Sequence, residues 1–253
     1  MAQRTTLTNN IGNRHTMRTS LRAIAIVALM IPSVTVQADD WYFAFKTSVA
    51  VSTIDDITHK GTIGTGAQIG NDIDGKLRDT EDDDVTAGIG LALGRTFGAW
   101  AIEADYHWRY RTDWDASIPT PSIQTMTNLH TNIESSALML NAIRSGALGE
   151  KWRWQIGIGA GMTFHDFESD YIEREVPGVR PQMRFSDEDS STEFTWSVLG
   201  GVSRALGEAW RFNLRYHYTD FGDLEVGPYP SRPGRLFAEY SAHEIYASLE
   251  RDL

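Results

Sequence analysis

Two polar residues near the C-terminal end of the chain have the side chains that nucleophilic catalysis requires. His217 and Thr219 lie two positions apart in the stretch YHYTDFG (216–222). A hydroxyl nucleophile needs a base within hydrogen-bonding reach and an acid that orients the base. Alternation along a β-strand places both side chains on the same face as Arg215. We favour the interpretation that His217 belongs to a network of ion pairs on that face, and we keep catalysis as the alternative.

A second candidate site is the acidic stretch GNDIDGKLRDTE (70–81), which has several features of a calcium-binding EF-hand loop. Suitable residues stand at loop positions 3, 5, 6 and 12, namely Asp72, Asp74, Gly75 and Glu81. Position 1 is Gly70, which offers no side-chain ligand, and no helices are expected on either side. We therefore predict a solvated acidic connection here, with weak binding of divalent cations as the alternative.

The composition of the chain argues against several classes of function. The chain has no cysteine, so a disulfide, a thiol nucleophile or a cysteine-ligated zinc ion cannot form. The histidines have no metal-ligand spacing, and we predict no metal and no cofactor. The formal charge is −11, and leaving out the four arginines of residues 1–38, a segment without acids, gives −15 for residues 39–253. Such acidity argues against nucleic acid as a partner.

Residues 1–38 have the features of a secretory signal peptide. Positive charge precedes the apolar run AIAIVALMI (23–31), at Arg4, Arg14, Arg18 and Arg22. Small residues end the segment, and we expect cleavage after Ala38. The apolar run is shorter than the roughly 20 residues that a spanning helix needs, so an uncleaved membrane anchor is the less favoured alternative.

The rest of the chain alternates apolar and polar side chains in eight segments. In WAIEADYHWRYR (100–111), every second residue is apolar or aromatic, which is typical of a β-strand with one apolar and one polar face. The whole set of predicted strands lies at 41–52, 85–94, 100–111, 132–143, 152–164, 193–206, 210–220 and 241–253.

The connections between these segments fall into two classes. Short ones follow the second, fourth and sixth segments, and long polar ones lie at about 53–83, 112–131, 165–192 and 221–240. Short turns at one end and long loops at the other are the plan of a transmembrane barrel. We predict an all-β fold over residues 39–253, an eight-stranded antiparallel up-and-down transmembrane β-barrel.

Aromatic residues indicate which face of the strands meets lipid. One row follows the short turns, and a second row lies near the far ends of the same strands. From Trp100 to Tyr110 is 10 steps, about 33 Å of strand or about 25 Å along the barrel axis, the height of the apolar band. A soluble ligand-binding barrel of eight strands has no room inside for such rows. The predicted aromatic girdle comprises Trp100, Trp108, Tyr110, Trp152, Trp154, Trp210, Tyr216 and Tyr218.

The charged face of the strands then points into the barrel. Charges in a narrow lumen must be paired and hydrogen-bonded, so we predict a plug of ion pairs rather than an open pore. Glycines of 85–94 and 152–164 are expected to make room for long arginines. The predicted network comprises Lys46, Glu103, Asp105, Arg109, Arg111, Arg153, Glu193, Arg211, Arg215 and Glu244, with Glu250 and Asp252 as further acids of the same face.

Several stretches carry a family resemblance: AWAIEADYHWRYR, SSALMLNAI, WQIGIGAGMTF and FTWSVLGGVSRALGEAWRFNLRYHYTDFGDLE. They resemble the small outer-membrane β-barrel domain family, which includes opacity-type surface proteins and the transmembrane domain of outer-membrane protein A. The resemblance covers residues 39–253 and implies a bacterial outer-membrane location. The chain departs from the family by ending on Leu253 where a terminal Phe is usual, and this bears on its recognition by the assembly machinery.

The stretch around His217 is also similar to the His-x-Ser of an outer-membrane lipid A deacylase. Thr219 stands where that enzyme has serine, and both residues have inward parity, away from lipid. A lipid A-modifying enzyme is therefore the least favoured function.

We predict a non-enzymatic protein with a structural or adhesive surface role, because family members serve as structural proteins, adhesins, surface antigens and narrow pores. The connections at about 53–83 and 165–192 are long enough to bind a host-surface or extracellular ligand. The other expected partners are outer-membrane lipid and lipopolysaccharide, periplasmic chaperones and the barrel-assembly machinery. A narrow porin-like channel is the main alternative.

Overall fold

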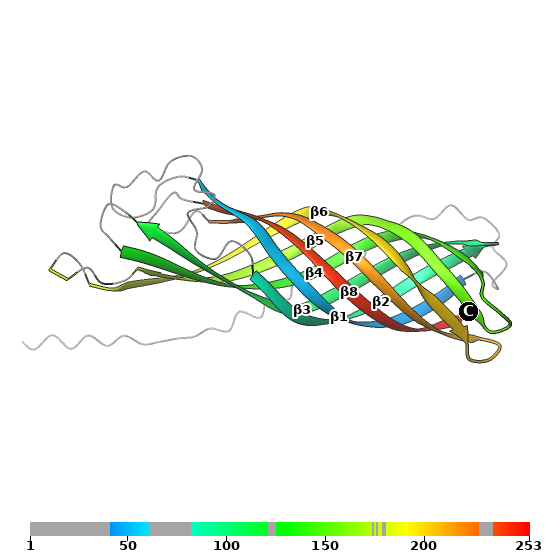
Figure 1. Cartoon of the computed structure of the whole chain (residues 1–253). Coiled ribbons are helices and arrows are strands. Elements are labelled where there is room, and N and C mark those ends of the chain that lie inside the picture. Colours follow the sequence, from blue (N-terminus) through cyan, green and yellow to red (C-terminus); the bar gives the residue numbers. More distant parts are fainter. Residues whose placement is uncertain are drawn as a thin grey trace, which may run out of the picture. The chain divides into compact units, whose positions relative to one another are not determined.

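Eight antiparallel strands close into one barrel in the computed structural model of the chain (Figure 1). The structure describes residues 41–60, 82–120, 125–173, 181–227 and 235–253, together with 175, 177 and 178. Each strand pairs with its sequence neighbours, and β1 also pairs with β8. The strands are β1 (Trp41–Lys60), β2 (Asp82–Phe97), β3 (Trp100–Thr120), β4 (Thr125–Ala147), β5 (Trp152–Glu173), β6 (Met183–Ala205), β7 (Trp210–Val226) and β8 (Arg235–Asp252).

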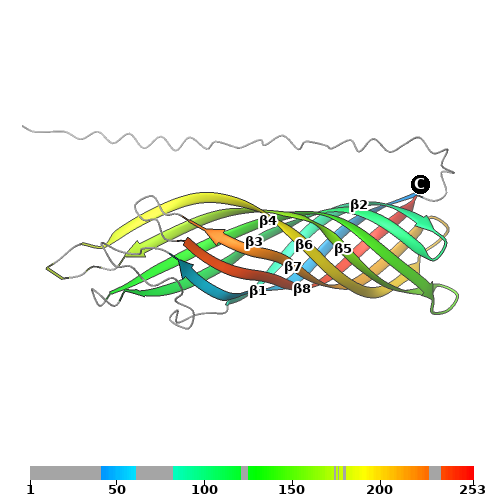
Figure 2. The same ribbon diagram turned by 90° about the horizontal axis from the view of Figure 1, so that it is seen from above.

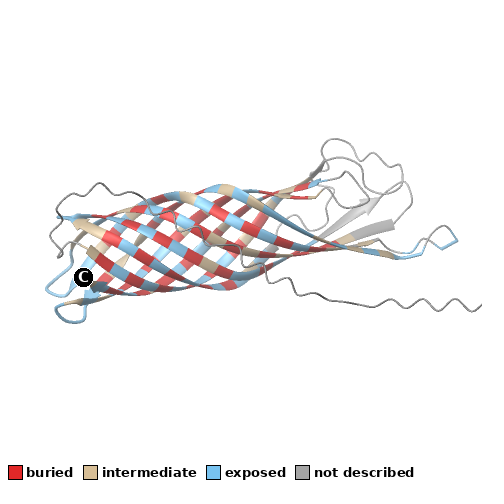
Figure 3. Cartoon of the chain, turned by 180° about the vertical axis from the view of Figure 1, so that it is seen from behind, coloured by how far each residue is buried: buried red, intermediate tan, exposed pale blue. Residues whose placement is uncertain are grey.

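The predicted fold, an eight-stranded antiparallel up-and-down barrel, is confirmed. Buried and exposed residues alternate along every strand, which gives the chequered pattern of Figure 3. On β4, for example, Leu138 and Leu140 are exposed, whereas Met139 and Asn141 point into the barrel. Closure satisfies the backbone hydrogen bonds of each strand inside the sheet, which is what a lipid environment requires.

The strands are longer than the sequence pattern predicts at the end of the long connections. β5 and β6 continue through much of the stretch 165–192 that was expected to be a loop. β6 pairs with β7 only from Trp196 onward, so its first residues pair with β5 alone. These two strands form a ribbon that runs beyond β7 (Figures 1 and 2). The period-2 pattern is hard to recognise there because few residues are apolar, although Phe167 and Phe185 point to the inner face.

Three register shifts interrupt the pairing at the same end of the barrel. They lie between Asp55 and Thr58, between Arg109 and Thr112, and between Asp220 and Gly222. A bulge inserts an extra residue and so exchanges the faces of every side chain that follows it. Counting every second residue from the membrane half of these strands therefore no longer identifies the inward-pointing side chains beyond the bulges.

Apolar side chains fill the interior beyond these bulges. Trp114 on β3 and Ile57 on β1 follow bulges and are completely buried, and Leu129 on β4 is almost completely buried. They belong to one cluster: Ala50, Ile54, Ile57, Trp114, Leu129, Ile133, Phe167, Phe221, Leu224, Val226, Leu236, Ala238, Tyr240 and Ala242. The barrel thus has a polar interior near its short turns and an apolar interior near its long connections.

The short turns close the opposite end of the barrel. Gly98 takes the left-handed conformation, with φ of 64°, in the turn between β2 and β3. The C-terminus lies at this end, where Leu253 N donates to Trp41 O at 3.0 Å. No helix in the described part of the chain is long and apolar enough to cross a membrane. The expected signal peptide (1–38) and the acidic stretch 70–81 lie outside the described residues.

Candidate functional site in the barrel lumen

Glu103 on β3 is the centre of a first layer of ion pairs in the lumen. Its Oε1 accepts from Lys46 Nζ at 2.6 Å and lies 3.2 Å from Arg215 Nη1. Its Oε2 accepts from the hydroxyl of Tyr42 at 2.9 Å. Lys46 also donates to Asp105 Oδ2 at 2.7 Å. All five side chains are almost completely buried, so each charge is compensated inside the barrel rather than by water.

Arg109 and Glu244 form a second layer closer to the long connections. Arg109 donates from Nε at 2.8 Å and from Nη2 at 2.9 Å, which makes a bidentate pair. Glu244 also accepts from Thr219 at 3.0 Å and from Tyr246 at 3.2 Å. The Arg109 guanidinium lies 4.5 Å from the centre of the Phe221 ring, where the apolar cluster begins. The second layer therefore connects the polar interior to the apolar interior.

Two buried histidines pack against the Tyr246 ring. The ring centroids of His107 and His217 are 4.8 and 4.3 Å from that of Tyr246. Ser48 and His107 Nε2 are 2.8 Å apart. His107 Nδ1 and His217 Nε2 have no hydrogen-bond partner in the described part of the chain. The histidines thus occupy the space along the wall between the two charged layers.

His217 and Thr219, the candidate nucleophilic pair, are not hydrogen-bonded to each other. The Thr219 hydroxyl donates to Glu244 rather than to a histidine, and that carboxylate is held by Arg109. Both residues are buried inside the barrel and face away from lipid. This geometry fits a structural role in the second layer.

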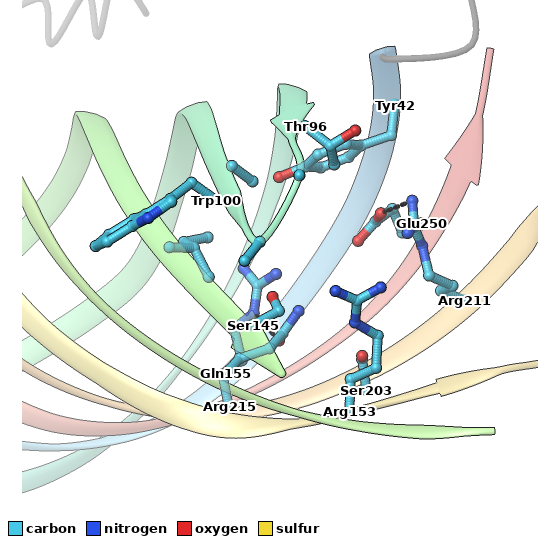
Figure 4. Close-up of a pocket in the computed structure, with 14 residues that line it drawn as sticks. Tyr42, Thr96, Trp100, Ser145, Arg153, Gln155, Ser203, Arg211, Arg215 and Glu250 are labelled. Atoms are coloured by element: carbon cyan, nitrogen blue, oxygen red, sulfur yellow. Dashed lines mark hydrogen bonds and ion pairs between the residues drawn. The ribbon is translucent and has the colours of Figure 1, made fainter. Parts of the chain in front are cut away.

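A third group of charges lies at the mouth of the barrel near the short turns. Arg211 Nη2 lies 2.5 Å from Glu250 Oε1 and also bonds Asp252. Asn213 donates to Glu250 at 3.1 Å. Arg153, which was predicted to belong to the network, lines the same mouth (Figure 4). Its side chain is exposed, and it has no carboxylate partner within 4 Å among the described residues.

The structure places two other predicted network residues outside the ion-pair layers. Arg111 lies on the outer face and is 3.5 Å from the exposed Glu168, so its predicted position in the lumen is wrong. The cause is the bulge after Arg109, which reverses the faces of β3. Glu193 lies half-buried above the layers, and no basic residue of the described chain forms an ion pair with it.

The predicted girdle residues all lie on the outer face of the barrel. Trp100, Trp152 and Trp210 are about half exposed at the short-turn end, as are Tyr110 and Tyr216 at the other end. Trp108, Trp154 and Tyr218 are partly covered by neighbours. Arginines lie over three of the tryptophan rings at the short-turn end, with Arg144, Arg204 and Arg251 each 5.4–5.6 Å from a ring centre. Such pairs suit an interface between apolar chains and polar headgroups.

Glycines make room for side chains in the lumen, but mostly not for the expected arginines. A Cβ on Gly94 would lie 2.1 Å from the Tyr42 ring, and one on Gly90 would lie 2.5 Å from His107 Nδ1. Only Gly201 on β6 lies against an arginine, Arg215, among the described glycines. Tyr42 and His107 therefore occupy the space that the β2 glycines leave, whereas on β5 Asn141 lies against Gly159 and Met139 against Gly161.

Sequence reasoning missed two parts of this interior. Tyr42 and Tyr246 were overlooked because a single tyrosine among polar residues gives no charge signal. Their inward parity, the same as that of Lys46 and Glu244, was the available signal. The apolar cluster was missed because most of its members lie in stretches that were assigned to the long connections, where three bulges also interrupt the alternation of β1, β3 and β7.

Three carboxylates form a group outside the membrane-spanning part. Asp55 and Asp56 at the β1 bulge and Glu239 on β8 place oxygens within 4.8 Å of one another. Such a spacing suits a divalent cation. Partial burial and the neighbouring charges of Asp56 and Asp55 raise the pKa of Glu239. Sequence spacing gave no sign of this group, because pairing between distant strands creates it.

The comparisons with known proteins concern the whole barrel. A family model described as the outer membrane protein beta-barrel domain matches residues 26–250. Neisserial surface protein A is 11% identical, with 83% of this chain and 97% of that chain covered and a TM-score of 0.42. OprG from Pseudomonas aeruginosa is 14% identical over 84% and 96%, with a TM-score of 0.47. Ail of Yersinia pestis is 8% identical over 82% and 99%, with a TM-score of 0.33. No curated protein matches the chain in sequence.

Proposed function

The chain belongs to the outer membrane protein beta-barrel domain family, and from that premise we propose that it is a surface protein of the bacterial outer membrane with a sealed lumen and a structural or adhesive role. The proposal has two parts, which stand on different observations. One concerns the interior of the barrel, and the other concerns the strands that extend beyond it.

The two buried ion-pair layers are the observation that carries the sealed lumen. Glu103 with Lys46 and Arg215, and Glu244 with Arg109, cross the interior between strands that are not neighbours in the sheet. An ion that passes must displace these partners, and breaking a buried pair costs about 3–5 kcal/mol. Beyond the layers, the apolar cluster offers no ligands to a hydrated ion. Both barriers support a plug rather than a pore.

Single-channel recording in planar bilayers tests the sealed lumen. We expect no discrete conductance steps from the wild-type protein. The double variant Arg109→Ala/Glu244→Ala removes the second layer only. Because the first layer and the apolar cluster remain, it is expected to give at most a small increase in leak. Arg111→Ala, on the outer face, is the matched control and is expected to match the wild type. Regular steps from the wild type would instead support the narrow channel.

The ribbon of β5 and β6 supports the surface role. Its outer positions are polar and exposed, for example Glu168 opposite Glu188. Arg184 and Ser186 on β6 both donate to Asp170 on β5, which ties the two strands together. A stiff polar ribbon that leaves the barrel is well placed to contact a partner outside the cell.

Shortening this ribbon tests the adhesive form of the proposal. A variant in which an Asn-Gly turn replaces residues 170–186 and links Ser169 to Asp187 retains the register of the remaining pairs. We expect it to fold and to lose adhesion of expressing cells to host-cell monolayers. A second variant, Glu168→Gln/Glu188→Gln, keeps the full length of the ribbon and removes only these two exposed charges. Adhesion that is unchanged in the shortened variant would leave only the structural role.

We propose no enzymatic activity for the chain. The second-layer role of Thr219 supports this, since its hydroxyl is hydrogen-bonded to a carboxylate that Arg109 neutralises. Mass spectrometry of lipid A from cells that overproduce the protein tests the point. The enzyme would be established instead if lipid A lacked an acyl chain in cells that overproduce the wild type and was complete in cells that produce Thr219→Val.

A further inference from the structure

The mouth of the barrel at the short-turn end contains a polar cavity that the proposed function does not use. Its volume is about 120 Å³, well below the roughly 300–1,000 Å³ of pockets for drug-sized ligands. Its lining includes the buried side chains of Arg215 and Gln155 and the turn at Gly98. The size restricts an occupant to a small ion or to one functional group of a larger molecule.

Three guanidinium groups line this cavity, against a single carboxylate. Arg153, Arg211 and Arg215 come from β5 and β7, and Glu250 comes from β8 (Figure 4). Glu250 and Asp252 compensate Arg211, and Glu103 compensates Arg215. Arg153 alone has no carboxylate within 4 Å in the described part of the chain, so its guanidinium group is not directly paired.

Hydrogen-bond donors at the mouth also lack acceptors. Arg211 Nε is buried and has no partner among the described residues. Ser203, which is buried, also lines the cavity with its hydroxyl-bearing side chain. Guanidinium groups present several N–H donors in one plane, which suits the oxygens of a phosphate or carboxylate. The unpaired guanidinium group of Arg153 and the unused N–H of Arg211 favour an anion with several oxygens.

We propose that this mouth binds a phosphate-type oxyanion, with Arg153 and Arg211 as its principal ligands. Arg215 stays bonded to Glu103 and Gln155 and forms the base of the site. Two sources supply such a group at this end of the barrel: free phosphate in the periplasm, and the phosphate of an anionic lipid headgroup in the inner leaflet. The site shares Arg215 with the first ion-pair layer, and it stands or falls independently of the adhesive role.

Arginine side-chain NMR tests the proposal on the full chain in nanodiscs. The probe is inorganic phosphate, titrated at constant ionic strength into ¹⁵N-arginine-labelled protein in phosphatidylcholine discs. We expect saturable shifts of the Nε–H signals of Arg153 and Arg211. Discs that contain phosphatidylglycerol, without phosphate, form the second arm. Signals that are already shifted there, and that phosphate no longer moves, identify the lipid as the source.

Two variants make the test specific. Arg153→Gln is expected to weaken phosphate binding about tenfold or more, because it removes one charged donor pair. Arg204→Gln, which lies at the same end but on the outer face over Trp152, removes the same charge and is expected to change the affinity less than about twofold. Arg153 has no partner to lose, so its replacement leaves the fold intact, which a heat-modifiability gel checks. Equal effects of the two variants, or no saturable shift in either arm, would overturn the site.

Discussion

Glu244 illustrates at the residue scale how the interior is held together. The carboxylate is completely buried and accepts four hydrogen bonds, two from Arg109 and one each from Thr219 and Tyr246. Removing one partner of a buried ion pair leaves the other partner's charge uncompensated. This costs more free energy than the intact pair contributes to stability. The stability of the barrel should therefore depend strongly on this one side chain.

Replacing Glu244 by Ala is expected to lower the free energy of unfolding by about 3–5 kcal/mol. Urea unfolding in lipid vesicles, followed by tryptophan fluorescence, measures the change. Glu188→Ala on the exposed ribbon is the control and is expected to stay within about 0.5 kcal/mol of the wild type. Equal effects at both positions would mean that Glu244 is not the buried acceptor described above.

Asp170 on the β5–β6 ribbon gives a prediction about pH. Hydrogen bonds from Arg184 and Ser186 lower the pKa of Asp170 below its ordinary value of 3.8. A carboxyl group whose pKa is lower in the folded than in the unfolded protein stabilises the fold at pH values above its unfolded pKa. This stabilisation is lost as the pH falls through its folded pKa. The ribbon should therefore loosen only below about pH 4, and the contribution stays under about 1 kcal/mol because the pair is exposed.

Carboxyl-carbon NMR titration checks this prediction. Arg184→Gln is expected to raise the pKa of Asp170 toward 3.8, whereas Arg235→Gln, which breaks a similar pair on β7 and β8, is expected to leave it unchanged. A pKa of Asp170 that does not respond to Arg184→Gln would show that the two strands of the ribbon are not paired in this register.

The bulge on β3 is the clearest feature at the scale of a single element. It places Arg109 inside the barrel, Arg111 outside and Trp114 inside again. Trp114→Ala should therefore cost about 3–5 kcal/mol, because it empties the apolar cluster. Arg111→Ala should cost less than about 1 kcal/mol, since its partner Glu168 is exposed. Urea unfolding of the two variants tests the assignment, and the opposite order would mean that β3 continues without a bulge.

The same strand explains what the sequence could and could not predict about the elements. From Trp100 to Arg109 the strict alternation predicts both the strand and the facing of each side chain, and the structure has the same arrangement. Beyond Arg109 the alternation shifts by one residue, and Arg111 was assigned to the wrong face. A bulge depends on pairing with the neighbouring strand, which no local pattern contains. Glu103 and Lys46 could be assigned to one face, but their contact required the register between strands.

At the scale of the whole barrel, the chain combines two opposite patterns of burial. In the membrane half, exposed side chains such as Leu91 and Ile158 are apolar and the interior is charged. Beyond the bulges, the interior is apolar, as at Leu224 and Leu236, and the outer face carries charges. The first pattern suits lipid and the second suits water. The change between them marks where the barrel leaves the membrane.

The accessibility of the lumen at Ser48 tests the sealed interior most directly. Ser48 is buried on β1, two residues from Lys46 of the first layer and two from Ala50, which lies opposite Glu244 of the second. The chain has no cysteine, so Ser48→Cys introduces a single thiol. We expect a small charged methanethiosulfonate reagent to leave this thiol unmodified in folded protein in nanodiscs, while it modifies the exposed Ser190→Cys rapidly. Rapid modification at both positions would contradict the sealed lumen and would favour a water-filled channel.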